Sequence, residues 1–403
     1  FGLALLMLVL VGCSGLPPFS SAPKPRADTA ADSSGAKAGR LKAYTEVIHG
    51  RAVTQRGLFT THRIGDTLYY EIPRDLLGAE LLLVTSLARN TGGALGGVQV
   101  DDRVLVWERQ GDRILLRSPI YGLTADSARP IHRAIEVATF PTIIASFDIK
   151  TFGPDSAAVI DVTGLFTGGT REFRLSQDGV SIERDRSFIE RVAAYPGNIE
   201  TEAAHTYTVV PPPFFGIQLP PQTASVLMRW SMVKLPERPM MPRRADDRVG
   251  YFSVGVVDYG TDEHRVARYG HITRWRLECP PGQQVPCRPV KPITFYVDPA
   301  TPEQWVPYVK AGIEAWQVAF EEAGFLDAIV AKDAPTPEED PSWSPDDARY
   351  SVVRWLPTTQ ENAMGPHVHD PRTGEILQSN IRVYHNVLNL LRSWYFTQVA
   401  PLD

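Results

Sequence analysis

Strand-like segments separated by turns follow one another from about residue 43 to residue 278, and they restrict this part of the chain to a β-rich fold. Residues 102–118 predict a hairpin whose turn is Gln110-Gly111-Asp112. One short helix is expected at 186–194. The other predicted strands are 67–72, 80–85, two within 143–166 on either side of Gly153-Pro154-Asp155, and 224–236. We therefore predict one or more β-rich domains of unknown function over residues 43–280.

The pattern changes after residue 288. A strand at 292–297 precedes Thr301-Pro302-Glu303-Gln304, which predicts a capping box at the start of a helix over 302–323. Gly324 is expected to end this helix. A second strand at 350–355 completes a strand-helix-strand unit, so the two strands should be parallel. The apolar face of the helix, expected in the core, comprises Trp305, Val309, Ile313, Trp316, Phe320 and Ala323.

Residues 369–385, HDPRTGEILQSNIRVYH, combine a turn with a strand that carries several polar side chains. The turn is Asp370-Pro371-Arg372-Thr373-Gly374, the strand runs through 375–384, and a further helix is expected to begin near Val387. With the β-rich region before them, these elements predict an α+β fold whose second part covers residues 288–403.

The N-terminus predicts a membrane anchor. Residues 1–12, FGLALLMLVLVG, form an apolar run too short to span a bilayer, with the length of the hydrophobic part of a signal peptide. The run ends at Cys13 in LVGC, which resembles a bacterial lipobox; a buried cysteine after an apolar strand is the alternative. Residues 14–42 are rich in Ser, Ala, Pro and Gly, and we expect a disordered tether. Residues 1–13 are thus interpreted as a truncated lipoprotein signal peptide, with Cys13 lipidated and the chain held in a bacterial cell envelope, at the outer membrane or in the periplasm.

The other two cysteines lie in CPPGQQVPC, a turn between two strand-like segments. In an oxidising envelope compartment, Cys279 and Cys287 are expected to form a local disulfide. A metal site is the weaker alternative, because two thiols at this spacing do not make a zinc motif.

Charge and histidine content exclude some classes of function. The formal net charge is −5 and no run of Lys or Arg stands out, so we expect no nucleic-acid partner. His367 and His369 are two residues apart and would share one face of a strand, which makes them weak candidates for a metal site. No third ligand is identifiable near them, and a polar loop is the alternative.

Four segments together resemble a known family. They are 315–325 (AWQVAFEEAGF), 370–376 (DPRTGEI), 231–240 (SMVKLPERPM) and 247–252 (DRVGYF). The chain from about residue 43 onward resembles bacterial zinc-dependent metalloproteases in which two domains of unknown function precede a metzincin-like domain. The resemblance implies that residues 288–403 form the upper half of such a domain: strand, helix, strand and edge strand.

The family's zinc helix, H-E-x-x-H-x-x-G-x-x-H, is absent from the sequence. The nine histidines are at positions 49, 62, 132, 205, 264, 271, 367, 369 and 385; no two are four apart, and none precedes a Glu. The zinc ligands and the general base are therefore expected beyond residue 403, in a longer protein of which this chain is the N-terminal portion. Zinc is implied for that longer protein, whereas we expect this chain to bind none, to carry no catalytic residue and to be inactive alone.

In metzincin-like folds the edge strand of the upper subdomain lines the active-site cleft, where an extended peptide adds through main-chain hydrogen bonds. We expect the strand after the turn at 370–374 to be that edge; a purely structural edge protected by its polar side chains is the alternative. The predicted substrate-binding residues are Gly374, Glu375, Ile376, Leu377, Gln378, Ser379, Asn380 and Ile381.

The sequence thus predicts the N-terminal portion of an envelope-anchored zinc-dependent metalloendopeptidase. Its expected partners are a peptide or protein substrate and, through Cys13, a membrane. One alternative is a non-catalytic β-rich lipoprotein that acts as a binding or scaffolding module, and another is an inactive relative of the protease.

Overall fold

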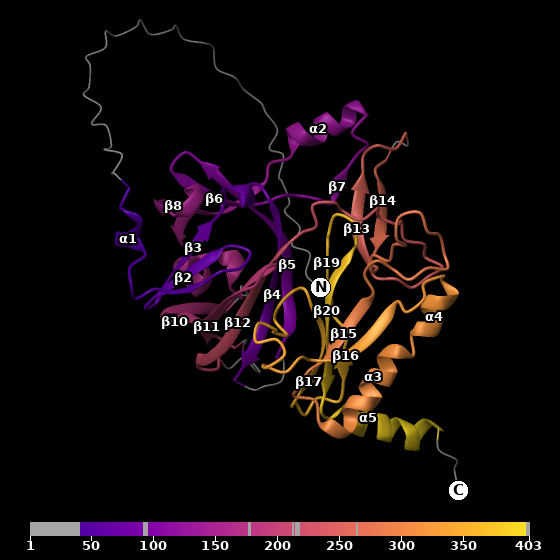
Figure 1. Ribbon diagram of the computed structural model, residues 1–403. Coiled ribbons are helices and arrows are strands. Elements are labelled where there is room, and N and C mark those ends of the chain that lie inside the picture. The colour runs from indigo at the N-terminus through magenta and orange to yellow at the C-terminus, as the bar shows by residue number, and fades with distance from the viewer. Residues whose placement is uncertain are drawn as a thin grey trace, which may run out of the picture. The chain divides into compact units, whose positions relative to one another are not determined.

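The computed structural model describes residues 41–91, 96–175, 179–211, 213, 218–262 and 265–399 (Figure 1). The predicted signal peptide, Cys13 and all of the predicted tether except its last two residues lie outside the described residues.

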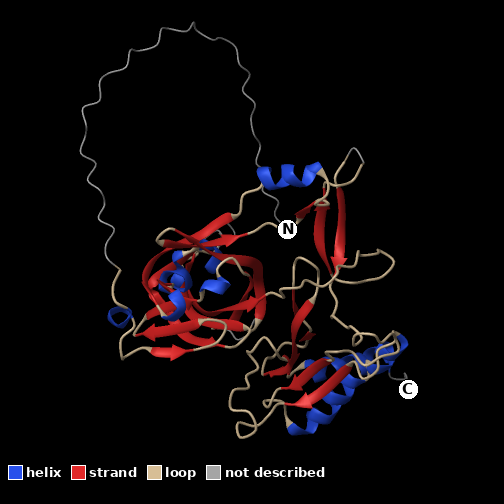
Figure 2. Ribbon diagram, turned by 45° about the horizontal axis from the view of Figure 1, so that its top comes forward, coloured by secondary structure: helices blue, strands red, loops and turns tan. Residues whose placement is uncertain are grey.

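Eleven strands form one sheet in the order β1-β2-β3-β9-β8-β6-β5-β4-β12-β11-β10, and every neighbouring pair is antiparallel. Figure 2 shows these strands curling round into a nearly closed barrel. The strands are β1 (Val53–Gln55), β2 (Thr60–Ile64), β3 (Thr67–Ile72), β4 (Glu80–Asn90), β5 (Val98–Gln110), β6 (Arg113–Ser118), β8 (Thr142–Phe152), β9 (Ala158–Asp161), β10 (Val180–Ala194), β11 (Asn198–Val209) and β12 (Gln222–Lys234). The predicted hairpin at 102–118 is confirmed as β5 and β6.

Side chains, rather than a ladder of paired strands, bridge the two ends of this sheet. Gln55 of β1 donates to the carbonyl of Val192 in β10 at 3.0 Å, and Arg63 of β2 donates to the carbonyl of Ile189 at 2.7 Å. Because the sheet closes on itself in this way, its edge strands are protected. The largest side chains sealed inside are Trp107, Trp230, Tyr70, Phe59, Phe166 and Phe173.

The remaining elements of this region are short. The helices are α1 (Tyr44–Val47), η1 (Arg74–Leu76), α2 (Pro130–Ala138), η2 (Pro154–Ser156), η3 (Leu165–Gly169) and η4 (Arg171–Phe173). A three-stranded sheet, in the order β14-β13-β7, comprises β7 (Leu123–Thr124), β13 (Ser253–Asp258) and β14 (Ala267–Ile272). Leu165, Phe166 and Phe173 of η3 and η4 are buried, so these turns fill the barrel core.

The predicted helix at 186–194 is wrong, because these residues belong to β10. The spacing of Ile189 and Val192 would also suit one face of a helix, yet both side chains are buried in the barrel while the backbone pairs with β11. Pairing along nearly the whole of β11 outweighs the local preference of a charged segment.

The C-terminal part contains a mixed sheet in the order β16-β15-β17-β20-β18, with β19 also paired to β20. Strands β16, β15, β17 and β20 are mutually parallel, which confirms the predicted parallel pair, whereas β18 and β19 run antiparallel to β20. The elements are β15 (Ile293–Val297), η5 (Glu303–Trp305), α3 (Val306–Glu314), α4 (Gln317–Glu322), β16 (Ile329–Asp333), β17 (Ser351–Leu356), β18 (Ala363–Met364), β19 (His367–His369), β20 (Ile376–Tyr384), α5 (Val387–Trp394) and η6 (Tyr395–Val399).

The predicted helix at 302–323 is interrupted. It consists of η5, α3 and α4, with a break at Ala315 and Trp316. The predicted capping box is not formed, because the hydroxyl of Thr301 has no hydrogen-bond partner among the described residues. Trp316, which lies at the break, is 64% exposed and is not the predicted core anchor. Gly324 does end the helix, at a φ of 90°.

Candidate functional site

The turn at 370–374 joins the mixed sheet to the barrel. Arg372 donates to both carboxylate oxygens of the fully buried Asp370, to Glu80 at the start of β4 at 2.5 Å, and to the carbonyl of Pro236 at 2.9 Å. Gly374 has a φ of 77°, and an added Cβ would overlap the carbonyl oxygen of Ile272. The polar residues of this turn therefore fix the start of β20 against the barrel.

Strand β20, which contains most of the predicted substrate-binding residues, is not an open edge. It pairs with β17 on one side and with β19 and β18 on the other, as in the pairs of His367 with Ser379 and of Val368 with Gln378. Gly374 and Ile376 bond to Arg274 through their backbones. The expectation failed because the short strands before the turn fold back along β20. The edge of the mixed sheet is therefore formed by β18 and β19.

His367 and His369, the weak metal candidates, lie together on β19 with their ring centroids 5.2 Å apart. Burial lowers the pKa of both imidazoles, and the charge of His369 lowers that of His367 further. The described part of the chain contains no group of three or more His, Cys, Asp or Glu residues placed to hold a metal ion. The two histidines alone do not fit a zinc site, which needs three or four protein ligands.

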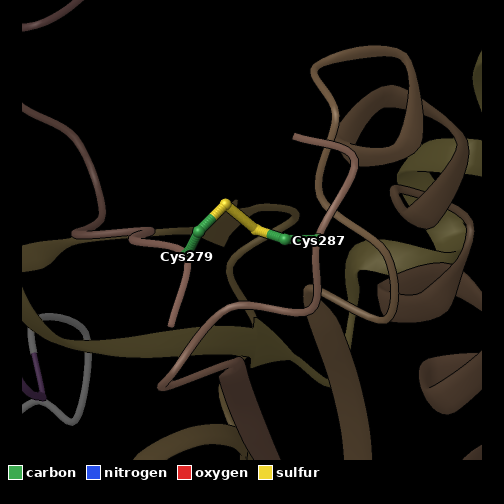
Figure 3. Close-up of a disulfide and its surroundings, with 2 residues drawn as sticks. All are labelled: Cys279 and Cys287. Carbon is green, nitrogen blue, oxygen red and sulfur yellow. A yellow bond between two sulfur atoms is a disulfide. The ribbon is translucent and has the colours of Figure 1, made fainter. Parts of the chain in front are cut away.

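Cys279 and Cys287 form a disulfide with a Cα–Cα distance of 5.7 Å (Figure 3). Backbone bonds tie the bridge to the end of α4: Cys287 N donates to the carbonyl of Gly324 at 3.0 Å, and Leu326 N donates to the carbonyl of Cys287 at 2.9 Å. Such bonds persist in oxidising compartments, so the disulfide indicates an extracytoplasmic location. Among the described residues, no helix has the length and apolar composition needed to cross a membrane.

A charged cavity of about 470 Å³ lies between one face of the barrel and one face of the mixed sheet. The barrel wall comes from β4, β11 and β12, and the sheet wall from β17, β19 and β20 (Figure 1). Alternate residues of β20 line it, while Ile381 and Val383 pack on the opposite face with the apolar core below α3. The charged lining residues are Arg89, Glu200, Arg229, Asp346, Arg354 and Arg382.

Asp346 forms ion pairs with three arginines at this cavity. It lies between β16 and β17, and its carboxylate accepts from Arg191 of β10 at 2.7 Å, Arg229 of β12 at 2.9 Å and Arg354 of β17 at 2.6 Å. Burial would raise its pKa, but the charges of Arg229 and Arg354 outweigh burial and hold the pKa of Asp346 well below its usual range. One carboxylate thus links the barrel to the mixed sheet.

Glu200 of β11 is an acid kept partly protonated near neutral pH. Its side chain accepts from Asn198 at 2.6 Å, and the residue is 3% exposed. Burial, opposed by Arg229 and aided by the charge of Asp346, raises the pKa of the Glu200 carboxyl to about 7. A perturbed acid in a cavity is a common feature of binding and catalytic sites.

Sequence reasoning missed this cavity. Its charged residues range from Arg89 to Arg382, and no two of them form a motif. The only local signal was the row of polar side chains on the strand at 375–384, which includes Gln378, Asn380 and Arg382 on one face.

Comparisons with known proteins assign two domains to the barrel region. Residues 41–90 match the family model of a domain of unknown function, DUF5118, and residues 97–280 match that of a second one, DUF5117. No curated protein and no solved structure matches the chain. The chain therefore carries a DUF5118 domain followed by a DUF5117 domain, both of unknown function.

Proposed function

We propose that this chain is the N-terminal part of an extracytoplasmic zinc-dependent metalloendopeptidase, whose peptide substrate lies along β18 and β19. The outer edge of β19 carries this proposal, because no further strand pairs with it among the described residues. The opposite edge of the sheet, at β16, is covered: Glu314 accepts from Ala331 N, and Gln317 accepts from Ile329 N. An uncovered edge offers main-chain groups to which an extended peptide can add.

The order of the parts supports the same proposal. Two domains of unknown function precede the mixed sheet, as they do in the metalloproteases that the sequence resembles. The parallel strands β15, β17 and β20 with helix α3 agree with the strand-helix-strand unit expected of the upper half of a metzincin-like domain. The predicted substrate strand moves from β20 to its neighbour β19, where His367 and His369 would flank the peptide.

Zinc remains a requirement of the longer protein in this proposal. Since His367 and His369 do not fit a zinc site, we assign no step of peptide hydrolysis to residues of this chain. The role left to the chain is to position a peptide and to hold the enzyme in its compartment. Lipidation of Cys13 would supply the membrane anchor, and the Cys279–Cys287 disulfide supports the same compartment.

The decisive experiment reads the gene beyond residue 403 and assays the longer protein. The reading frame beyond residue 403 should encode an H-E-x-x-H helix, and the longer protein should bind one zinc ion and cleave a peptide library in a chelator-sensitive manner. As a matched control, the 403-residue chain should hold no stoichiometric zinc and cleave nothing, yet bind extended peptides more tightly than their backbone N-methylated counterparts. A continuation that lacks the zinc helix would refute the protease proposal and leave a binding lipoprotein.

A further inference from the structure

Arg382 is the one arginine of the charged cavity's sheet wall that has no ion pair among the described residues. Its neighbours Arg229 and Arg354 both bond to Asp346, whereas no carboxylate within reach pairs with Arg382. The Arg382 side chain crosses towards the loop between β4 and β5, where a Cβ added to Gly97 would lie 3.0 Å from the Arg382 Nε. The guanidinium therefore rests against backbone rather than against an acid.

The positive charge of Arg382 has no negative partner among the described residues. The Arg382 side chain is partly buried. Burial, reinforced by the positive charges of Arg354 and Arg229 and opposed by Tyr384, lowers the pKa of the Arg382 guanidinium. A desolvated cation without a counter-ion destabilises a folded protein, so an anion that enters the cavity would be bound favourably.

We propose that the cavity is a binding site for a monocarboxylate ligand, whose carboxylate pairs with Arg382. Arginine presents two parallel N–H groups that match the two oxygens of a carboxylate. A single carboxylate is proposed because Arg229 and Arg354 already pair with Asp346, so that Arg382 is the sheet-wall arginine left to pair with a ligand.

The other residues that line the cavity restrict the chemical class of the ligand. Val84, Leu356 and Val368 give the cavity apolar walls, and the side-chain oxygen of Asn380 is buried without a hydrogen-bond partner among the described residues. A ligand that combines a carboxylate, an apolar side chain and an N–H donor satisfies all three features. N-acylated amino acids and peptides have this chemistry. The exposed Arg89 and Pro357 at the rim connect the cavity to solvent.

The two sources of such a carboxylate can be separated by binding measurements on the full chain. N-acetylleucine tests a terminal carboxylate, with the neutral N-acetylleucinamide as its control. A peptide with blocked ends and one internal Glu tests an acidic side chain, with the Gln peptide as its control. We expect calorimetry to show binding of one of the two acids and little of either neutral counterpart, and binding of neither acid would overturn the proposal.

Variants of Arg382 locate the site. Arg382→Met should weaken binding about 10- to 100-fold, the usual loss for a charge-assisted pair, and Arg382→Lys should have a smaller effect. The matched control, Arg113→Met, removes an exposed arginine of the barrel and should leave binding unchanged. Gly97→Ala crowds the guanidinium while keeping its charge, and it also strains a backbone with a φ of 81°, so it too should weaken binding.

Stability separates a ligand-binding role from a structural one. Because the unliganded Arg382 is a partly buried charge without an ion pair among the described residues, Arg382→Met should unfold at a temperature equal to or above that of the wild type in the absence of ligand. Binding that survives both Arg382→Met and Gly97→Ala would refute the site. A large fall in the melting temperature of Arg382→Met would show that the residue supports the fold instead. The proposal does not depend on the peptidase function of the longer protein.

Discussion

Replacing Glu200 with Gln should stabilise the protein at alkaline pH and have little effect in acid. The pKa of this carboxyl is about 7 in the folded state, against 4.5 for the ordinary side chain. A pKa raised by folding means that the folded state holds its proton more tightly than the unfolded state. The contribution of Glu200 to stability is therefore fully present below pH 4.5 and is lost as the pH rises through 7.

The size of the effect follows from the shift. Each pKa unit corresponds to about 1.4 kcal/mol, so ionisation of Glu200 should cost the wild type about 2–3 kcal/mol between pH 5 and pH 8. Glu200→Gln carries no charge and can still accept from Asn198, so it avoids this loss. Urea unfolding followed by tryptophan fluorescence at both pH values measures the difference, and an unchanged dependence on urea concentration would confirm that the same transition is compared.

Glu202, two residues along β11, provides the matched control. Burial opposes ionisation here too, but hydrogen bonds from Arg191 and the charge of Arg229 prevail and lower the pKa of Glu202. A lowered pKa contributes stability that is present above the unfolded value and is lost as the pH falls through the folded value. Glu202→Gln should therefore be more destabilising at pH 8 than in acid, the opposite trend. If the stability gap between wild type and Glu200→Gln were the same at pH 5 and pH 8, burial would not be holding a proton on Glu200.

Three further outcomes are expected. Gly374→Ala should cost more than about 2 kcal/mol, because alanine resists the positive φ and its Cβ would overlap the carbonyl of Ile272, whereas Gly365→Ala, with open space around it, should be neutral in the same melting assay. Trp316→Ala should change stability by less than about 1 kcal/mol, since the side chain is 64% exposed, whereas truncation of the buried Ile313 in Ile313→Ala should cost about 2–5 kcal/mol; equal losses would contradict the exposure of Trp316. Reducing the Cys279–Cys287 bridge, whose cysteines are eight residues apart, should lower unfolding stability by about 2–3 kcal/mol, and an unchanged melt in reductant would argue against it.

Local patterns predicted the elements that depend on local chemistry. Alternating residues and a Gly-containing turn identified the hairpin of β5 and β6, and Gly324 marked the end of α4 because few other residues adopt its φ of 90°. The failures arose where distant parts of the chain decide. Ile189 and Val192 have a spacing that suits a helix, but pairing with β11 makes them part of a strand.

The charged cavity could not be predicted from the sequence, because distant parts of the chain form it. Asp346 gains its importance from Arg191 and Arg229, which are more than a hundred residues away in sequence and belong to other strands. The sequence predicted the free edge at β20, whereas β19 forms it. The three residues of β19 are too few to show the alternating pattern of a strand.

Strand β4 shows that the two matched regions form one folding unit. It lies in the DUF5118 region, yet both of its neighbours in the sheet, β5 and β12, lie in the DUF5117 region. A cut between residues 90 and 97 would leave one piece with a strand paired to nothing and the other with a gap across its barrel. Leu81 and Leu83, both fully buried, would lose most of their surroundings. Gene rearrangement could therefore move the two regions to a new protein only as a pair.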